Sequence, residues 1–247
     1  MQIVFLGAGG YHPNSRRHTA CVMVPELGVV FDAGTGSFRI AQHLVTERLD
    51  IFLSHVHLDH VFGLTSLIGL FKKDDPTRIR VHGEADKLDA IQQHLYAPQL
   101  FPVTPNFTPV PLEETIELDS TTLKSFPLVG HPGGSVGYRL DTADGKSLAY
   151  VTDTIAHADA AYVESLSGVD LLIHEAYFDD DRRDFANLTG HSCLPDVIDL
   201  AEKCGAAHLV LVHVNPRDDR DEPFDLTEAR SRVPAVTLGF DGLTIDL

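Results

Sequence analysis

The 247-residue chain contains 43% hydrophobic residues, enough to bury the core of one large α/β domain or of two small ones. Asp and Glu outnumber Lys and Arg 36 to 19, and the formal charge of −17 disfavours binding along an extended nucleic acid, because such binding relies on basic side chains. The three cysteines form no CxxC pair, which argues against a disulfide framework and a thiolate zinc site. No apolar run is long enough to span a membrane and no export signal is recognised, so we expect a soluble cytoplasmic protein.

The predicted elements are short β-branched strands interrupted by a few helices. Apolar and alternating runs predict strands at 3–7, 21–24, 29–34, 51–55, 79–83, 123–129, 136–140, 147–153, 170–176, 208–214 and 235–239. Helices are expected at 61–72, 84–96, 158–167 and 192–204, the last with Pro195 in its first turn and Gly205 at its end. This order predicts an α/β fold in which two β-sheets pack face to face with helices outside.

Two segments fit neither type of element. The stretch 97–111 contains five prolines, which we expect to exclude regular structure. It is interpreted as a stiff surface connection, or alternatively as a substrate wall or subunit contact presenting Phe101 and Phe107. The charged run DDDRRDF at 179–185 predicts a solvated loop, from which Arg182 and Arg183 can reach an anionic ligand.

The strongest chemical signal is the motif SHVHLDH at 54–60. His55 and His57 are two residues apart, so in an extended chain they project to the same side and can bind one ion together. Asp59 and His60 follow the turn, just ahead of an apolar helix, and can face a second ion. Imidazole and carboxylate ligands suit zinc, manganese or iron.

Three further ligand-type residues follow predicted strands. His131 comes after the apolar run 126–129, and Asp153 and His213 lie at or near the ends of the strands 147–153 and 208–214. Each of them alone is typical of a turn or cap residue, but together with the motif at 54–60 they predict a shared metal site.

This pattern resembles the metallo-β-lactamase superfamily. His-x-His-x-Asp-His at 55–60, with FDAGTG (31–36) upstream, precedes His131, Asp153 and His213 in the family's order, and the resemblance covers nearly the whole chain. It implies a single hydrolase domain at 1–247, an αββα sandwich of two mixed β-sheets flanked by helices, and two divalent metal ions, with zinc expected first and manganese or iron as alternatives. By position, His55, His57 and His131 hold one ion, Asp59, His60 and His213 hold the other, and Asp153 bridges them. The resemblance also implies that Asp32 in FDAGTG orients a ligand histidine, with a turn-capping aspartate as the alternative.

Later segments resemble the ribonuclease Z and phosphodiesterase branch of this superfamily. IHEAYF (173–178) is similar to its His-Glu-Ala-Thr segment and TGHSC (189–193) to its His-Ser/Thr segment. The resemblance implies that His191 donates a proton to the leaving oxygen and that Glu175 orients it, with Asp59 also assigned to catalysis. The alternative is that His191 merely precedes a helix and Glu175 pairs with a nearby base. His174 alternates to the opposite strand face, so we expect it to be structural.

One departure from that branch bears on the substrate. Members that process transfer RNA carry a long RNA-gripping insertion between the positions of His131 and Asp153, where this chain has only 21 residues, predicted as two strands and a turn. We therefore expect a dinuclear phosphodiesterase that acts on a small or cyclic phosphodiester or a short RNA end through a metal-bridging hydroxide.

Other functions stay open at this point. The same ligands suit a carboxyl-ester, thioester or lactone hydrolase, a tRNA 3′-processing endoribonuclease, or a non-catalytic metal-binding protein. The expected partner is a small anionic substrate, with a homodimer as an option, and neither membrane contact nor extended nucleic-acid binding is expected.

Overall fold

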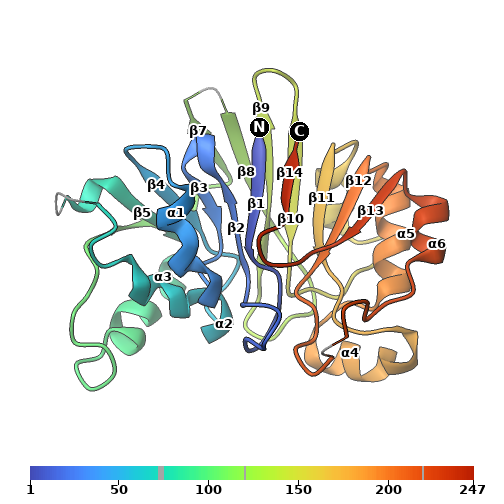
Figure 1. Cartoon of the computed structure of the whole chain (residues 1–247), viewed down its shortest axis with the longest axis horizontal. Coiled ribbons are helices and arrows are strands. Elements are labelled where there is room, and N and C mark those ends of the chain that lie inside the picture. Colours follow the sequence, from blue (N-terminus) through green and yellow to red (C-terminus); the bar gives the residue numbers. More distant parts are fainter. Residues whose placement is uncertain (72–74, 120, 219) are drawn as a thin grey trace. The chain divides into compact units, whose positions relative to one another are not determined.

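The computed structural model describes residues 1–71, 75–119, 121–218 and 220–247 (Figure 1). The chain divides into two compact units, one formed by Met1–Leu112 and Phe240–Asp246 and the other by Glu113–Gly239 with Leu247. Each unit is built on a mixed sheet of seven strands. The single domain expected at 1–247 stays a prediction.

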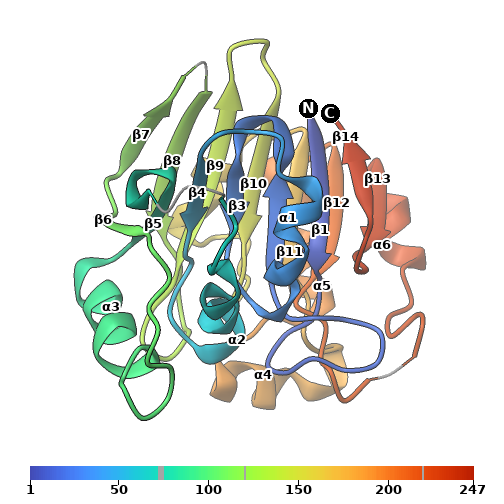
Figure 2. The same ribbon diagram turned by 60° about the vertical axis from the view of Figure 1, so that its left-hand side comes forward.

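The first unit has the strand order β14-β1-β2-β3-β4-β5-β6. Its strands are β1 (Gln2–Gly7), β2 (Cys21–Val24), β3 (Val29–Phe31), β4 (Leu49–Phe52), β5 (Ile79–Gly83), β6 (Thr108–Pro111) and β14 (Thr244–Asp246). Its helices are α1 (Ile40–His43), α2 (Leu58–Val61) and α3 (Ala85–Ala90), the last extended by a π-helical turn at Ile91–Leu95, with 3₁₀ turns at Pro25–Leu27, Thr35–Arg39, Phe62–Leu67 and Pro76–Arg78. Apolar residues of α1 and α3 belong to one buried cluster with residues of β4 and β5, and α1 lies in front of this sheet in Figure 2.

A buried carboxylate ties together the strands that lead to the motif at 54–60. Asp50 in β4 is fully buried and accepts hydrogen bonds from Arg48 Nε at 3.0 Å, Arg80 Nη2 at 2.8 Å and His82 Nε2 at 2.8 Å. Burial acts to raise the pKa of Asp50, but the hydrogen bonds from His82 and Arg80 outweigh it, so the pKa of this carboxyl lies below its usual range. The network fixes β4 against β5 just before the chain reaches the motif.

The second unit has the strand order β13-β12-β11-β10-β9-β8-β7. Its strands are β7 (Thr115–Leu118), β8 (Thr121–Pro127), β9 (Val136–Thr142), β10 (Ser147–Val151), β11 (Leu171–Glu175), β12 (His208–Val212) and β13 (Ala235–Leu238). Its helices are α4 (Arg183–Thr189), α5 (Leu194–Cys204) and α6 (Thr227–Arg232), with 3₁₀ turns at Ala161–Leu166 and Asp180–Arg182. Strands β10 to β13 run parallel, and apolar side chains of α5 pack on β11 and β12 (Figure 1).

Most of the predicted elements are present. The predicted α/β class of two mixed sheets flanked by helices is confirmed, and all eleven predicted strands occur, nine of them with shifted ends. Helix α5 has Pro195 in its first turn and ends at Gly205, whose φ is 70°. The predicted helix 61–72 is replaced by α2 and the following 3₁₀ turn, with residue 72 outside the described residues, and 158–167 forms only the turn at Ala161–Leu166.

Two expectations were wrong. The proline-rich stretch 97–111 contains β6, because β6 is an edge strand and an edge tolerates residues that cannot donate a backbone hydrogen bond. The charged run 179–185, expected to be a loop, forms a 3₁₀ turn and the start of α4. The ion pairs of Arg183 explain why this segment is helical, since its guanidinium pairs with Asp180 at 2.6 Å and also with Asp196.

Among the described residues, no helix is long and apolar enough to cross a membrane.

Candidate metal and catalytic centre

The motif at 54–60 gathers three imidazoles within the first unit. His55 follows β4 and is buried, while His57 is exposed, and their ring centroids lie 4.5 Å apart. His60 lies in α2, is fully buried, and has its ring centroid 4.2 Å from that of His55. The change of direction after His57, predicted from the sequence, therefore returns His60 to the side of His55.

Asp32 is the residue that orients His60. Its carboxylate is fully buried and accepts a hydrogen bond from His60 Nδ1 at 2.8 Å. It also accepts from the backbone N–H of Ser54 at 2.7 Å and from the Ser54 hydroxyl at 2.8 Å. Of the two interpretations of Asp32, the geometry supports orientation of a histidine, and the bond to Nδ1 leaves Nε2 of His60 as the nitrogen that can ligate a metal.

Backbone groups hold Asp59 beside His60. The Tyr11 N–H donates to Asp59 Oδ2 at 2.8 Å, and the same oxygen lies 3.3 Å from His60 Nε2. Gly34 is required here, since a Cβ at that position would lie 2.4 Å from the Asp59 carbonyl oxygen. The first unit thus presents a carboxylate and an imidazole nitrogen that can share one ion.

In the second unit, the parallel strands bring three acidic and imidazole groups to one edge of the sheet. Asp153 follows β10, Glu175 ends β11 and His213 follows β12, and these strands are neighbours in register. Five non-glycine residues of the described chain have positive φ, and Asp32 (57°), Asp153 (53°) and His213 (53°) are three of them. Such conformations cost energy and concentrate at functional sites.

The two oxygens of Asp153 face different histidines. Oδ1 lies 3.5 Å from His131 Nε2 and Oδ2 lies 3.3 Å from His213 Nε2. His131 Nδ1 donates to the Gly190 carbonyl at 3.0 Å, which directs Nε2 of that ring toward Asp153. Burial lowers the pKa of His131 although Asp153 opposes the shift, and a neutral imidazole is the form that binds a metal. This donor set fits a carboxylate shared between two ligand groups.

His191 and Glu175 form a pair at the same edge. His191 Nδ1 lies 3.0 Å from Glu175 Oε2, and Glu175 is fully buried. The Thr154 N–H donates to the other oxygen, Oε1, at 2.6 Å, so both oxygens of Glu175 accept hydrogen bonds. The side chain of His191 keeps 13% of its surface exposed, which leaves part of it accessible to a substrate.

Neighbouring residues fix the position of the His191 ring. The Tyr177 ring stacks on it with a centroid distance of 4.4 Å and an interplanar angle of 14°. Gly190 precedes it with φ of 75°, and a Cβ there would lie 2.6 Å from the Gly130 carbonyl oxygen. His174 is fully buried instead, with Nδ1 donating to the Glu175 carbonyl at 2.8 Å, and burial lowers its pKa. His174 is thus buried and hydrogen-bonded to the backbone, as expected for a structural residue.

Two groups of ligand atoms in the second unit are close enough to hold a metal ion. One comprises His131, Asp153 and His191 and the other Glu175, His191 and His213, with the atoms of each group within 4.8 Å of one another. His191 occurs in both, so its assignment as an acid instead of a ligand stays a prediction.

Residues 28–214 match the family model described as the beta-lactamase superfamily domain. The chain belongs to this superfamily. A ribonuclease Z of Haloarcula marismortui is 26% identical over 98% of this chain and 96% of its own length. Human tRNase Z, short form, has a TM-score of 0.76 at 24% identity over 100% of this chain and 99% of its own. A diphosphatase from the PhnP family has a TM-score of 0.74 at 22% identity over 100% and 97%. The predicted family resemblance is confirmed.

Some residues of the superfamily site escaped the sequence reasoning. Ser54 hydrogen-bonds Asp32, the Thr152 hydroxyl donates to Asp153 Oδ2 at 2.7 Å, and Tyr177 stacks on His191. Ser54 and Thr152 each directly precede a predicted ligand, which is the only signal the sequence carries for them. The role of Tyr177 depends on tertiary packing and has no signal in its residue type.

Proposed function

We propose that this hydrolase of the β-lactamase superfamily is a phosphodiesterase that uses two divalent metal ions. The observation that carries the proposal is the hydrogen bond between His191 and the buried Glu175, at the sheet edge that also bears His213 and Asp153. A carboxyl-ester intermediate can collapse without a dedicated acid, whereas an alkoxide leaving phosphorus needs a proton. The pair is therefore best explained by chemistry at phosphorus.

The ligand assignment follows the family pattern, residue by residue. We propose that His55, His57 and His131 hold one ion, that Asp59, His60 and His213 hold the other, and that Asp153 is shared. Two sites of mixed imidazole and carboxylate ligands suit zinc, with manganese or iron as alternatives. When bound, such a pair of ions polarises the phosphoryl group and activates water for in-line attack.

The protein's own groups then have distinct tasks. Glu175 engages Nδ1 of His191, so a proton passed to the leaving oxygen must come from Nε2. The Thr154 N–H fixes the Glu175 carboxylate, and Tyr177 restricts rotation of the imidazole ring. His191 thereby meets the leaving oxygen in one orientation, which lowers the entropic cost of proton transfer. Asp59, held by the Tyr11 N–H, serves as one ligand of the second ion in this assignment.

A short RNA end is a second candidate substrate, because relatives of the chain bear the names ribonuclease Z and tRNase Z. Recognition of a whole transfer RNA is disfavoured by two features of this chain. The segment between β9 and β10 is a simple hairpin with no arm, and the formal charge is −17. Binding of a folded RNA depends on basic side chains, so we propose a small diester or a single strand end.

A substrate panel tests the proposal. Metal-loaded protein should hydrolyse a bis-aryl phosphate faster than the corresponding monoester, since the monoester carries an extra negative charge into an acidic protein. Cyclic nucleotides, a lactone, a thioester and a precursor transfer RNA complete the panel. Turnover of the lactone or thioester far above that of every phosphodiester would replace this function with carboxyl-ester hydrolysis. The expected homodimer stays a prediction, and sedimentation analysis would check it.

A further inference from the structure

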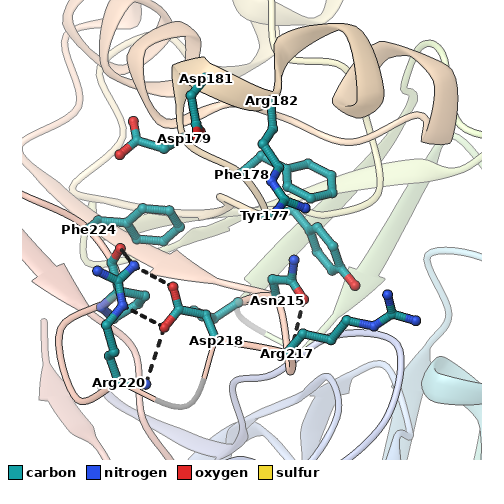
Figure 3. Close-up of a pocket in the computed structure, with 12 residues that line it drawn as sticks. Tyr177, Phe178, Asp179, Asp181, Arg182, Asn215, Arg217, Asp218, Arg220 and Phe224 are labelled. Atoms are coloured by element: carbon teal, nitrogen blue, oxygen red, sulfur yellow. Dashed lines mark hydrogen bonds and ion pairs between the residues drawn. The ribbon is translucent and has the colours of Figure 1, made fainter.

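A cavity of about 550 Å³ lies in the second unit, outside the proposed metal ligands (Figure 3). Its walls come from the segment after β11, which includes Tyr177 and Arg182, and from the segment after His213, which includes Asn215 and Arg217. Phe224 closes another side. None of the residues proposed to bind metal lines it, and the function proposed above assigns the cavity no task.

The charges in this cavity are unequally paired. Arg220 is engaged by Asp218, with Nε 2.8 Å from Oδ1. The guanidinium groups of Arg182 and Arg217, by contrast, form no ion pair with any described carboxylate. Asp179 and Asp181 also line the cavity, but Figure 3 shows their carboxylates away from Tyr177, whereas both guanidinium groups lie on the Tyr177 side. The Tyr177 side of the cavity is therefore positive within a strongly acidic protein.

Tyr177 connects this cavity to the proposed reaction. Its ring stacks on His191 at 4.4 Å, and the same side chain forms part of the cavity wall. The oxygen protonated by His191 belongs to the leaving alcohol, so the part of the substrate that extends past Tyr177 is the leaving group. A leaving group that enters the cavity meets Arg182 and Arg217.

We propose that the Arg182–Arg217 cavity binds a second anionic group, of the phosphate class, on the leaving alcohol of the substrate. A planar guanidinium donates two parallel hydrogen bonds to phosphate oxygens, and two such groups on one side of a cavity, neither in an ion pair with a described carboxylate, suit a phosphate group. The inference rests on the proposed phosphodiesterase function and narrows its substrate class. The preferred substrate is a phosphodiester whose leaving nucleoside or sugar carries another phosphate.

Kinetics on a uridine dinucleotide in three forms tests this inference: without a terminal phosphate, with a 5′-phosphate, and with a 3′-phosphate. A phosphate on the leaving nucleoside should lower KM by about 10–100-fold in the unmodified protein, the range expected for charge-assisted bonds to arginine. Arg182→Ala and Arg217→Ala should each remove about tenfold of this preference and leave KM for the unphosphorylated form within about twofold. Arg182→Lys should retain part of it, because a point charge replaces the fork.

Arg232→Ala is the matched control, since Arg232 lies in α6 of the same unit, pairs with Glu202 and Glu228, and does not line this cavity. It should keep the full preference. Absence of any preference in the unmodified protein, or a preference that survives the Arg182→Ala/Arg217→Ala double variant, would overturn the inference.

A binding measurement separates this inference from the proposed function. Inorganic phosphate titrated into metal-depleted protein should bind by calorimetry, with loss of binding in the double variant and retention in Arg232→Ala. If phosphate binds in this arginine-dependent way but no dinucleotide is hydrolysed, the cavity assignment stands and the phosphodiesterase proposal fails. Equal phosphate binding by the double variant and the unmodified protein would refute the cavity assignment directly.

Discussion

Replacement of His191 by alanine separates a proton donor from a metal ligand. His191 Nδ1 is 3.0 Å from Glu175, so the variant removes the group that we propose to protonate the leaving oxygen. Positioned acid catalysis contributes about 10²–10⁴-fold, and turnover of dialkyl phosphodiesters should fall by that factor. A diester with an aryl leaving group should lose less than about tenfold, because a phenolate departs without a proton.

The variant Glu175→Gln gives a smaller effect whose size follows from the structure. Both oxygens of Glu175 accept hydrogen bonds, from Thr154 N–H at 2.6 Å and from His191 Nδ1. A glutamine has one acceptor oxygen, so it can satisfy only one of these donors. Loss of one charge-assisted bond costs about 1–2 kcal/mol, which corresponds to roughly 5–30-fold in turnover of the dialkyl substrate.

The assay compares kcat for dialkyl and aryl diesters and measures bound metal in the same preparations. His157→Ala, an exposed histidine of the second unit outside the site, is the control and should change neither quantity. Equal losses on both substrates with metal retained would refute the acid role of His191. Loss of metal in His191→Ala would instead make it a ligand, as its proximity to His131 and Asp153 permits.

Five further outcomes are expected. Asp153→Ala should reduce bound metal below about two ions per chain and abolish turnover, while Asp153→Asn keeps part of the binding, as metal analysis would check. Asp32→Asn should weaken metal affinity about 10–100-fold in a competition titration, because it removes the carboxylate that orients His60. Asp50→Ala should lower the free energy of unfolding by about 2–3 kcal/mol, since it leaves the buried His82 and the guanidinium of Arg80 without their acceptor. Because the pKa of Asp50 is lowered in the folded protein, this stabilisation is present above the unfolded-state pKa and is lost as the pH falls through the folded-state pKa. The free energy of unfolding of the unmodified protein should therefore fall below about pH 4, and that of Asp50→Asn should fall less. Cleavage of precursor transfer RNA should be weak and fall steeply with salt, and efficient cleavage at moderate salt would contradict the weight given to charge.

Patterns local in the chain were predictable from the sequence. Strands β10 to β12 are buried on both faces and appear as apolar runs, and each of Asp153, Glu175 and His213 lies at the end of one such run. Strands β6, β7 and β14 were missed because they are short edge strands, whose residues need not be apolar.

Interactions between distant segments were not predictable. The stacking of Tyr177 on His191 joins residues on different segments, as does the bond from His131 to the Gly190 carbonyl. A backbone carbonyl has no residue type, so the sequence carries no signal for such a partner. The prediction of a loop at 179–185 was wrong for a related reason, since Arg183 of this segment pairs with Asp196, which lies in α5.

The most direct test of the central claim is hydrolysis of a bis-aryl phosphate while a divalent metal is titrated into metal-free protein. The account predicts that activity rises until about two ions are bound per chain, and that Asp153→Ala stays inactive throughout. Activity that saturates at about one ion per chain, or a fully metal-loaded protein that hydrolyses a lactone but no phosphodiester, would contradict it.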